Sequence, residues 1–220
     1  MKTKGKGFVV LGLGSFGMSL ARELAELGCE VVAVDQDKDK VREIADEVSY
    51  AMCADIGEPG VLESLGGRNL DGALVATAEN LEASIMATIS AKEAGIPFVM
   101  AKARNRVHES VLDKVGADYV VYPERDMGKR VARILLSNSF KDWIELSPKF
   151  SMVETDIPKS WIGKTLLELN LRERYHINVV AVIYADGMTD VILDARRTLP
   201  ADSKVVMVGA NEDLEQFKDV

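Results

Sequence analysis

The chain has 220 residues, of which 47% are hydrophobic, so it is long enough for one ordinary domain and a smaller companion. Acidic residues outnumber basic ones by 35 to 27, and the formal net charge of -8 argues against binding to a nucleic-acid backbone. No stretch approaches the roughly 18 apolar residues of a membrane span, and the N-terminus lacks the cleavage site of a signal peptide, so we expect a cytosolic protein.

The first part of the chain alternates short valine-rich runs with helical patterns. The runs have the length of strands and are apolar on both faces, which suits a parallel sheet covered on both sides. Several of the helical patterns end at a glycine, the residue that favours a left-handed helix end (Gly28, Gly66, Gly95 and Gly116). This order predicts an α/β fold with a Rossmann-like, doubly wound parallel sheet. The expected strands cover residues 8–13, 30–35, 49–54, 72–77, 97–102 and 118–123.

A glycine-rich turn follows the first of these runs. Residues 12–17, with the sequence GLGSFG, fit the pattern GxGxxG between a strand and a helix, and Asp35 ends the next strand. In this pattern Gly12 permits a tight turn, Gly14 lets the backbone approach a phosphate, and Gly17 allows close packing of helix on strand. The helix that begins near Ser15 attracts anions through its free N–H groups and its dipole.

The turn therefore predicts a bound adenine nucleotide or dinucleotide, with Asp35 accepting hydrogen bonds from the ribose hydroxyls. The alternative is that the glycines only make a tight connection between strand and helix. Other polar or small residues at later strand ends face the same crevice in this fold. They are Asp55, Thr77, Ala78, Lys102 and Glu124. A turn role for Asp55, and solvated charges at Lys102 and Glu124, are the alternatives.

Chemical turnover is not favoured. A hydride-transferring enzyme usually places a proton donor beside the nicotinamide, and the chain has only two histidines. His108 lies within a helical pattern and His176 in the small second unit, where each is expected to be a surface or packing residue. The two cysteines, Cys29 and Cys53, lie in apolar contexts and are expected to be buried free thiols. Binding without catalysis is the preferred interpretation.

The alternation of strand-like runs and helical patterns ends after Pro123. Residues 124–138 predict one more helix, and residues 141–158 alternate like an exposed strand interrupted by prolines. We place the boundary between a nucleotide-binding domain and a second unit at residues 138–150. The second unit, 150–220, is expected to be a small α+β domain. Its expected elements are a helix-like stretch at 161–175, a strand pair about Asp186-Gly187, and a strand then a helix at 204–217.

Over essentially its whole length the chain resembles the cytosolic regulatory subunits of the Ktr and Trk potassium uptake systems. The resemblance rests on GLGSFG, AVDQDKDKV and AKARNRVHESVLDKVGADYVVYPERDMGKRVA, with the small trailing domain. Such subunits consist of an RCK (KTN) N-terminal domain, expected here over 1–138, and an RCK C-terminal domain, expected over 150–220. The chain is closer to the Ktr type, because it has one RCK unit where the Trk type usually has two.

The resemblance implies a ring of subunits, commonly an octamer, docked on the cytosolic face of a membrane-embedded potassium transporter. In such rings ATP favours an expanded, active state and ADP an inactive one, so the ligand acts as a switch through its differential affinity for the two shapes. The helix at 124–138 would match the crossover helix that links neighbouring subunits. A NAD(H)-sensing subunit of the Trk kind is the alternative, and a NAD-dependent oxidoreductase is a more distant one.

The resemblance also implies roles for individual residues. Residues 12–17, including Ser15 and Phe16, match the phosphate turn, Asp35 the ribose acid, and Asp55 and Lys102 contacts in the crevice. Glu124 matches an acid near the nucleotide of the neighbouring subunit and is the candidate metal ligand. Many Ktr subunits have arginine at the position of Ser15, so the preference for a triphosphate is an open question here.

The C-terminal domain resembles a module that binds cyclic di-AMP at a dimer interface in some relatives. Arg172, Ile177 and Asn178 lie roughly where such contacts occur. A plain dimerisation domain without a ligand is the alternative.

Overall fold

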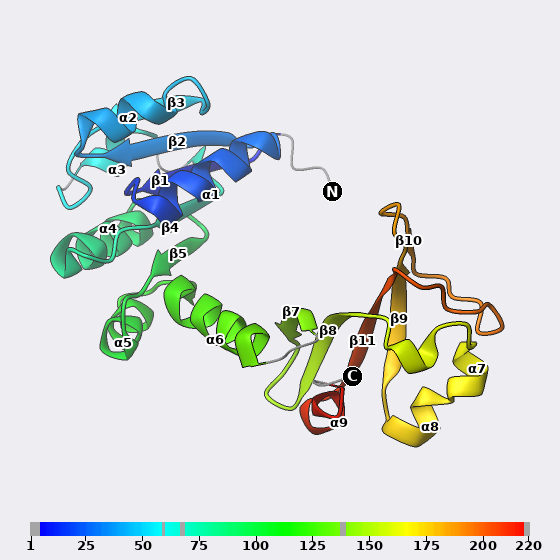
Figure 1. Ribbon diagram of the computed structural model, residues 1–220. Helices are drawn as coiled ribbons and strands as arrows, with labels where there is room; N and C mark the ends of the chain where they lie inside the picture. The colour runs from blue at the N-terminus through cyan, green and yellow to red at the C-terminus, as the bar shows by residue number, and fades with distance from the viewer. Residues whose placement is uncertain (1–4, 59, 67–68, 137–139, 218–220) are drawn as a thin grey trace. The chain divides into compact units, whose positions relative to one another are not determined.

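A computed structural model describes residues 5–58, 60–66, 69–136 and 140–217 (Figure 1). The chain forms two compact units, one that ends at Glu124 and one that begins at Arg125. The sequence predicts that the helix expected at 124–138 belongs to the first domain. The division after Glu124 places the helix Pro123–Leu136, apart from its first two residues, in the second unit.

The first unit is built on a parallel sheet of six strands in the order β3-β2-β1-β4-β5-β6. This is the strand order of a doubly wound Rossmann fold, which confirms the predicted fold class. Its elements in chain order are β1 (Gly7–Leu11), α1 (Ser15–Glu26), β2 (Glu30–Asp35), α2 (Lys38–Ile44), β3 (Tyr50–Cys53), α3 (Val61–Ser64), β4 (Gly72–Val75), α4 (Leu81–Glu93), β5 (Val99–Lys102), α5 (Arg106–Lys114) and β6 (Tyr119–Val121).

Both faces of this sheet are covered, as the doubly apolar runs predicted. Val9 of β1 belongs to a buried cluster with Ala87 of α4 and Leu112 of α5. The next residue along the strand, Val10, points to the opposite face and packs in a separate cluster with Ala21 of α1. With helices on both faces, a ligand can approach the sheet at the carboxyl ends of its strands. This is where ligands of this fold bind.

The ends of the helices follow the signals in the sequence. All four glycines expected to end helices, Gly28, Gly66, Gly95 and Gly116, have a positive φ. Side-chain oxygens of Asp37, Asn80 and Asn105 accept backbone N–H bonds at the N-termini of α2, α4 and α5.

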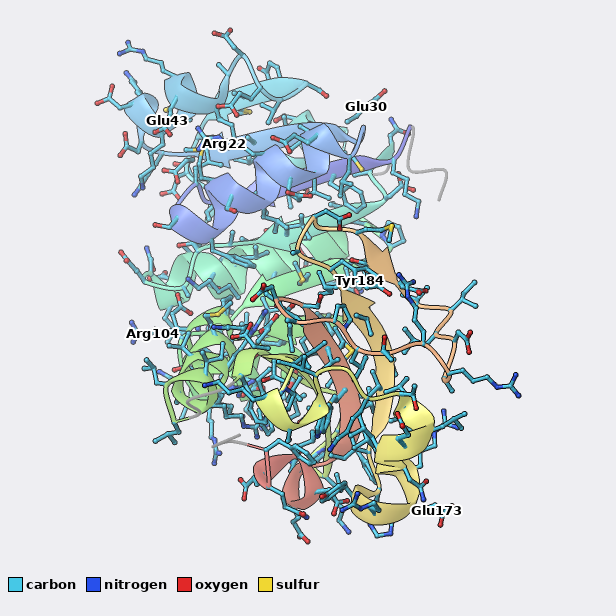
Figure 2. The ribbon with its side chains drawn as sticks, turned by 45° about the vertical axis from the view of Figure 1, so that its right-hand side comes forward. Arg22, Glu30, Glu43, Arg104, Glu173 and Tyr184 are labelled. Carbon is cyan, nitrogen blue, oxygen red and sulfur yellow. The ribbon has the colours of Figure 1, made fainter. Side chains whose placement is uncertain are left out.

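On the outer surface, α1 and α2 are joined by charged side chains. Arg22 of α1 lies 3.0 Å from Glu43 of α2 and 2.9 Å from Glu47 (Figure 2). The charged groups of both pairs are accessible to solvent, so these ion pairs contribute little to stability. Cys29 and Cys53 are both free thiols, as expected. The expectation that both are buried is wrong: Cys29 is half-buried, and Cys53, on the edge strand β3, is exposed.

The second unit is an antiparallel sheet of five strands in the order β10-β9-β11-β8-β7 with short helices. The strand pair predicted about Asp186-Gly187 is present as β9 and β10. The elements are α6 (Pro123–Leu136, which begins just before the boundary), β7 (Phe140–Glu145), β8 (Phe150–Asp156), η2 (Lys159–Trp161), α7 (Leu166–Leu169), α8 (Leu171–Tyr175), β9 (Asn178–Ile183), β10 (Thr189–Asp190), β11 (Lys204–Ala210) and α9 (Asn211–Glu215).

Two stretches of the second unit differ from their predictions. The single strand expected over 141–158 is a hairpin of β7 and β8, because a turn closes between Ser147 and Phe150 through paired backbone hydrogen bonds. The helix-like stretch at 161–175 is a 3-10 turn and two short helices, broken where Asn170 adopts a left-handed φ of 45°. Among the residues that the structure describes, no helix is long and apolar enough to cross a membrane.

Candidate functional site

The glycine-rich turn connects β1 to α1 at the carboxyl edge of the parallel sheet. Gly12 has a φ of 99°, a conformation that side chains rarely adopt, and a Cβ there would lie 3.0 Å from the backbone nitrogen of Thr77. A Cβ on Gly17 would lie only 2.0 Å from the carbonyl oxygen of Gly12 and 2.9 Å from Cβ of Ala76. The first and third glycines are therefore required by the turn and by the close packing of α1.

Gly14 differs from its two neighbours in this motif. Its φ of -67° and ψ of 178° are open to any residue. A Cβ built at Gly14 would meet no other atom within 4 Å. Within the described structure, neither backbone conformation nor packing requires a glycine here, and the space above the turn is open.

The first turn of α1 borders this open space. Gly14 is the N-cap of the helix and supplies no side-chain cap, and the first turn contains no acidic residue. Ser15 is exposed and Phe16 is half-buried. An N-terminus of this kind attracts an anion through its unsatisfied N–H groups and its dipole.

Asp35 lies at the end of β2, next to the glycine turn. Its side chain is largely buried, and its Oδ2 accepts a hydrogen bond of 2.6 Å from the backbone N–H of Leu13. Its Oδ1 accepts a second bond of 2.9 Å from the backbone N–H of Asp37, and Nζ of Lys40 lies 4.0 Å from Oδ2. Since a carboxylate has about four acceptor positions, room is left for ribose hydroxyls.

Lys102 and Glu124 meet at the same edge of the sheet. Nζ of Lys102, at the end of β5, lies 2.5 Å from Oε1 of Glu124 and 5.7 Å from the ring centroid of Phe16. The hydrogen bond from Lys102 lowers the pKa of the Glu124 carboxyl below its usual value. The ammonium group of Lys102, at the end of β5, thus lies near both the Glu124 carboxylate and the ring of Phe16 in the first turn of α1.

The remaining candidate residues at the strand ends differ in their exposure to solvent. The exposed Asp55 accepts a 2.9 Å hydrogen bond from the backbone N–H of Gly57, so it makes a turn of its own. Thr77 is half-buried against Gly12, and Ala78 is buried. Glu124, the candidate metal ligand, does not belong to any group of three or more acidic, histidine or cysteine side chains within the described ranges.

In the second unit, the three candidates for a further ligand do not share one environment. Arg172 on α8 and Asn178 at the start of β9 are exposed. The side chain of Ile177 between them is fully buried in the core. Ile177 as a whole residue is 0% exposed, so neither its side chain nor its backbone can contact a ligand without rearrangement.

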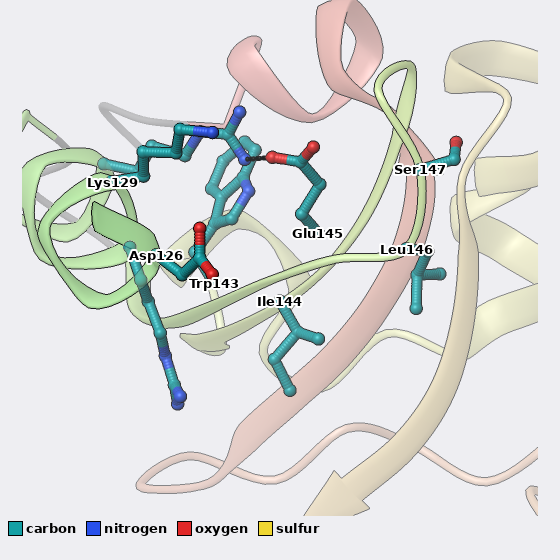
Figure 3. A pocket seen from close by; sticks show the side chains of 9 residues that line it. Asp126, Lys129, Trp143, Ile144, Glu145, Leu146 and Ser147 are labelled. Atoms are coloured by element: carbon teal, nitrogen blue, oxygen red, sulfur yellow. Dashed lines mark ion pairs between the residues drawn. The ribbon is translucent and has the colours of Figure 1, made fainter. Parts of the chain in front are cut away.

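A groove of about 370 Å³ lies between α6 and the β7–β8 hairpin (Figure 3). Arg130 and Arg133 of α6 pair with Asp142 and Glu145 of β7 at 2.6 and 2.7 Å, and Arg133 also lies over the ring of Trp143. These arginines already have carboxylate partners. The groove is therefore less suited to an anionic ligand than the glycine turn of the first unit.

His108 is one of the two histidines considered as a proton donor. Its side chain is 1% exposed, and neither ring nitrogen has a hydrogen-bond partner within the described structure. Burial, and after it the charge of Arg104, lowers the pKa of His108 below its usual value. A histidine so enclosed packs in the core, as expected from the sequence.

The buried His108 predicts a loss of stability in acid. Its folded-state pKa is lowered, so the unfolded chain binds more protons as the pH falls through the unfolded pKa of about 6.5, and the free energy of unfolding declines. The decline ends below the folded-state pKa. Urea unfolding between about pH 7.5 and about pH 5.5 measures it.

In that experiment His108→Leu should reduce the decline, whereas His176→Asn, which changes an exposed histidine, should retain it. Equal pH dependence of the His108→Leu variant and the unaltered protein would contradict this interpretation.

Comparison with known proteins gives consistent matches over both units. The TrkA-N domain family matches residues 8–123, and the TrkA-C domain family matches residues 152–220. The Ktr system potassium uptake protein C of Bacillus subtilis (strain 168) is 41% identical over 215 residues, covering 97% of this chain and 96% of that protein. The Ktr system potassium uptake protein A of the same organism is 34% identical over 220 residues, covering 99% of this chain and 98% of that protein.

Solved structures agree on the fold. The GsuK RCK domain superposes with a TM-score of 0.67 at 18% sequence identity, covering 99% of this chain and 47% of that chain. The GsuK channel bound to NAD superposes with a TM-score of 0.64 at 17% identity, covering 97% of this chain and 38% of that chain. The chain spans less than half the length of these solved chains.

Proposed function

Because this chain belongs to the family of potassium uptake proteins that carry a TrkA-N and a TrkA-C domain, we propose that it is the nucleotide-gated regulatory subunit of a potassium uptake system. The ligand is an adenine nucleotide, ATP or ADP, bound at the carboxyl edge of the parallel sheet. It controls the transporter by shifting the subunit assembly between two shapes.

The observation that carries this proposal is the open space above Gly14. Gly12 and Gly17 have structural reasons to be glycine, whereas Gly14 has none within the described structure. A phosphate held by the N–H groups of the α1 N-terminus would explain the glycine at position 14, because any side chain there would occupy the position of the phosphate. Asp35 then accepts the ribose hydroxyls, and Lys102 and Glu124 border the phosphate side.

The identity of the nucleotide is the finer part of the proposal. Ser15 offers one hydroxyl where arginine would offer a charged fork, so we expect modest discrimination between ATP and ADP by this residue. A NAD(H)-sensing subunit is the second candidate, since Asp35 suits any adenosine ribose and one fold neighbour is the GsuK channel bound to NAD. An absorbance change on mixing NADH with carbonyl substrates would instead indicate an oxidoreductase.

The partner of this subunit is a membrane-embedded potassium transporter of the Ktr or Trk type. The proposal follows from the names of the two Bacillus subtilis relatives, which are components of a Ktr system. The subunit then works in the cytoplasm, on the inner face of the membrane. In the second unit we keep cyclic di-AMP as the candidate second ligand, with Arg172 and Asn178 as exposed contacts.

The subunit is also expected to form a ring, commonly an octamer. Met127, Val131 and Leu135 form an apolar stripe at four-residue spacing along α6, and they are 53%, 43% and 78% exposed. Such a stripe is covered in a stable soluble assembly. Multi-angle light scattering should give a mass larger than that of a dimer, whereas a mass near that of the 24.1 kDa chain would contradict the ring.

The gating function is tested by comparing the two nucleotide states in solution. Small-angle X-ray scattering of the purified assembly should give a larger radius of gyration with ATP than with ADP. The physical reason is that a nucleotide moves the equilibrium only through its differential affinity for the two shapes. Identical scattering profiles, with both nucleotides shown to be bound, would contradict gating.

A further inference from the structure

We propose that Asp35 holds the phosphate-binding turn in shape, in addition to the ribose contact that the proposed function assigns to it. In this role Asp35 is a positioning residue, because it acts on the phosphate through the backbone of the turn. The inference rests on the proposed nucleotide site and deepens it. Its consequence is that Asp35 contributes to the binding of phosphate even when no ribose is present.

The first observation is the hydrogen bond between Asp35 and Leu13. Leu13 lies in the glycine turn between Gly12 and Gly14, and its N–H donates to Oδ2 of Asp35 at 2.6 Å across 22 positions of sequence. Asp35 is 8% exposed, and a hydrogen bond to a charged acceptor in such surroundings is stronger than one between neutral groups. The bond fixes the residue immediately before Gly14.

The second observation is that the backbone of β2 is hydrogen-bonded to the same turn. The N–H of Gly12 donates to the carbonyl oxygen of Val34 at 2.8 Å, one residue before Asp35. Two successive N–H groups of the turn are thus bonded to two successive residues of β2. The N–H groups that follow, at Gly14 and the first turn of α1, are those to which the proposed function assigns the phosphate.

The third observation is that Asp35 is itself held in place. Its Oδ1 accepts the N–H of Asp37 at 2.9 Å, and its own carbonyl oxygen accepts the N–H of Ala54 at 3.1 Å. A side chain fixed at both oxygens is a rigid support for the turn. The remaining acceptor positions stay available to a ribose.

Removing Asp35 should change the affinity for phosphate compounds without ribose in opposite directions under the two roles. Tripolyphosphate and pyrophosphate contain the anionic groups of a nucleotide without the ribose. If Asp35 contacted only ribose, its removal would take away a nearby negative charge and strengthen the binding of these anions. If Asp35 positions the turn, its removal weakens their binding.

The experiment uses the full chain and titrates tripolyphosphate and ADP into Asp35→Ala, with Asp35→Val as a second variant in case the first does not fold. Neither side chain can accept the N–H of Leu13. We expect the affinity for tripolyphosphate to fall about tenfold or more in each, the effect of losing one hydrogen bond to a charged acceptor. The affinity for ADP should fall further, because the ribose contact is lost as well. Amide hydrogen exchange of the ligand-free protein should become faster at Leu13.

Asp71→Asn is the matched control. Asp71 also accepts a backbone N–H, that of Gly7 at 2.8 Å, but at the start of β1, the end of the strand that is remote from the glycine turn. We expect Asp71→Asn to leave both the amide exchange at Leu13 and the affinity for tripolyphosphate unchanged. The comparison separates a general loss of stability from the loss of the hydrogen bond between Leu13 and Asp35.

Unchanged or increased affinity for tripolyphosphate in folded Asp35→Ala or Asp35→Val would overturn the positioning role while leaving the nucleotide site intact. Unchanged exchange at Leu13 in these variants would overturn it as well. Failure of the unaltered protein to bind ADP would overturn the proposed function itself, and the role of Asp35 in phosphate binding with it.

Discussion

Gly17→Ala is expected to lower the free energy of unfolding of the first unit by about 1–3 kcal/mol or more, the usual cost of overpacking. The added Cβ would lie 2.0 Å from the carbonyl oxygen of Gly12 and 2.9 Å from Cβ of Ala76. The Gly12 oxygen belongs to the backbone of the turn and cannot rotate away as a flexible side chain can. The start of α1 must then move off the sheet, and urea unfolding measures the loss.

Gly128→Ala is the control for this substitution. Gly128 lies within α6, and a Cβ there would meet no atom within 4 Å. The same change in an open helical position should be neutral or stabilising by up to about 1 kcal/mol, because alanine favours helix more than glycine does. Equal stabilities of the Gly17→Ala and unaltered proteins would show that α1 does not approach Gly12 and Ala76 this closely.

Gly14→Asp is expected to remove nucleotide binding and leave the fold intact. Aspartate is a favourable N-cap residue, and its charge suits the N-terminus of α1, so stability should be retained or increased. The same carboxylate would occupy the proposed phosphate position, where like charges 4 Å apart repel by about 4 kcal/mol at an effective dielectric constant of 20. We expect the affinity for ADP to fall by at least about a hundredfold.

Gly14→Ser separates the charge from the volume of the new side chain. Serine caps a helix comparably well but is neutral, so it should weaken ADP less than aspartate does. Undiminished ADP affinity in folded Gly14→Asp would exclude the open space as the phosphate position.

The architecture of the first unit was predictable because its signals are local. Runs such as residues 30–35 are apolar on both faces, and Gly28 and Gly95 mark helix ends with a positive φ. The requirement for glycine at position 17, which allows close packing of α1, was also predictable from its spacing to Gly12. In each case the residues that decide the structure lie within one strand or one helical turn of each other.

Other features were not predictable, because they depend on contacts between distant segments. The bond from Leu13 to Asp35 joins residues from two different strand ends, and no spacing rule indicates it. The burial of Ile177 depends on the packing of α8 against the second sheet. The prediction of one strand at 141–158 is wrong because alternation continues through both arms of a hairpin, and the turn between Ser147 and Phe150 resembles an interruption within one strand.

The central claim is that an adenine nucleotide binds at the glycine turn of the first unit. Titration calorimetry of the purified protein with ADP, ATP, NAD and NADH, repeated on Gly14→Asp, tests it most directly. The account predicts saturable binding of ADP or ATP to the unaltered protein and its loss in folded Gly14→Asp. Absence of binding by all four ligands, or identical titrations of the two proteins, would contradict it.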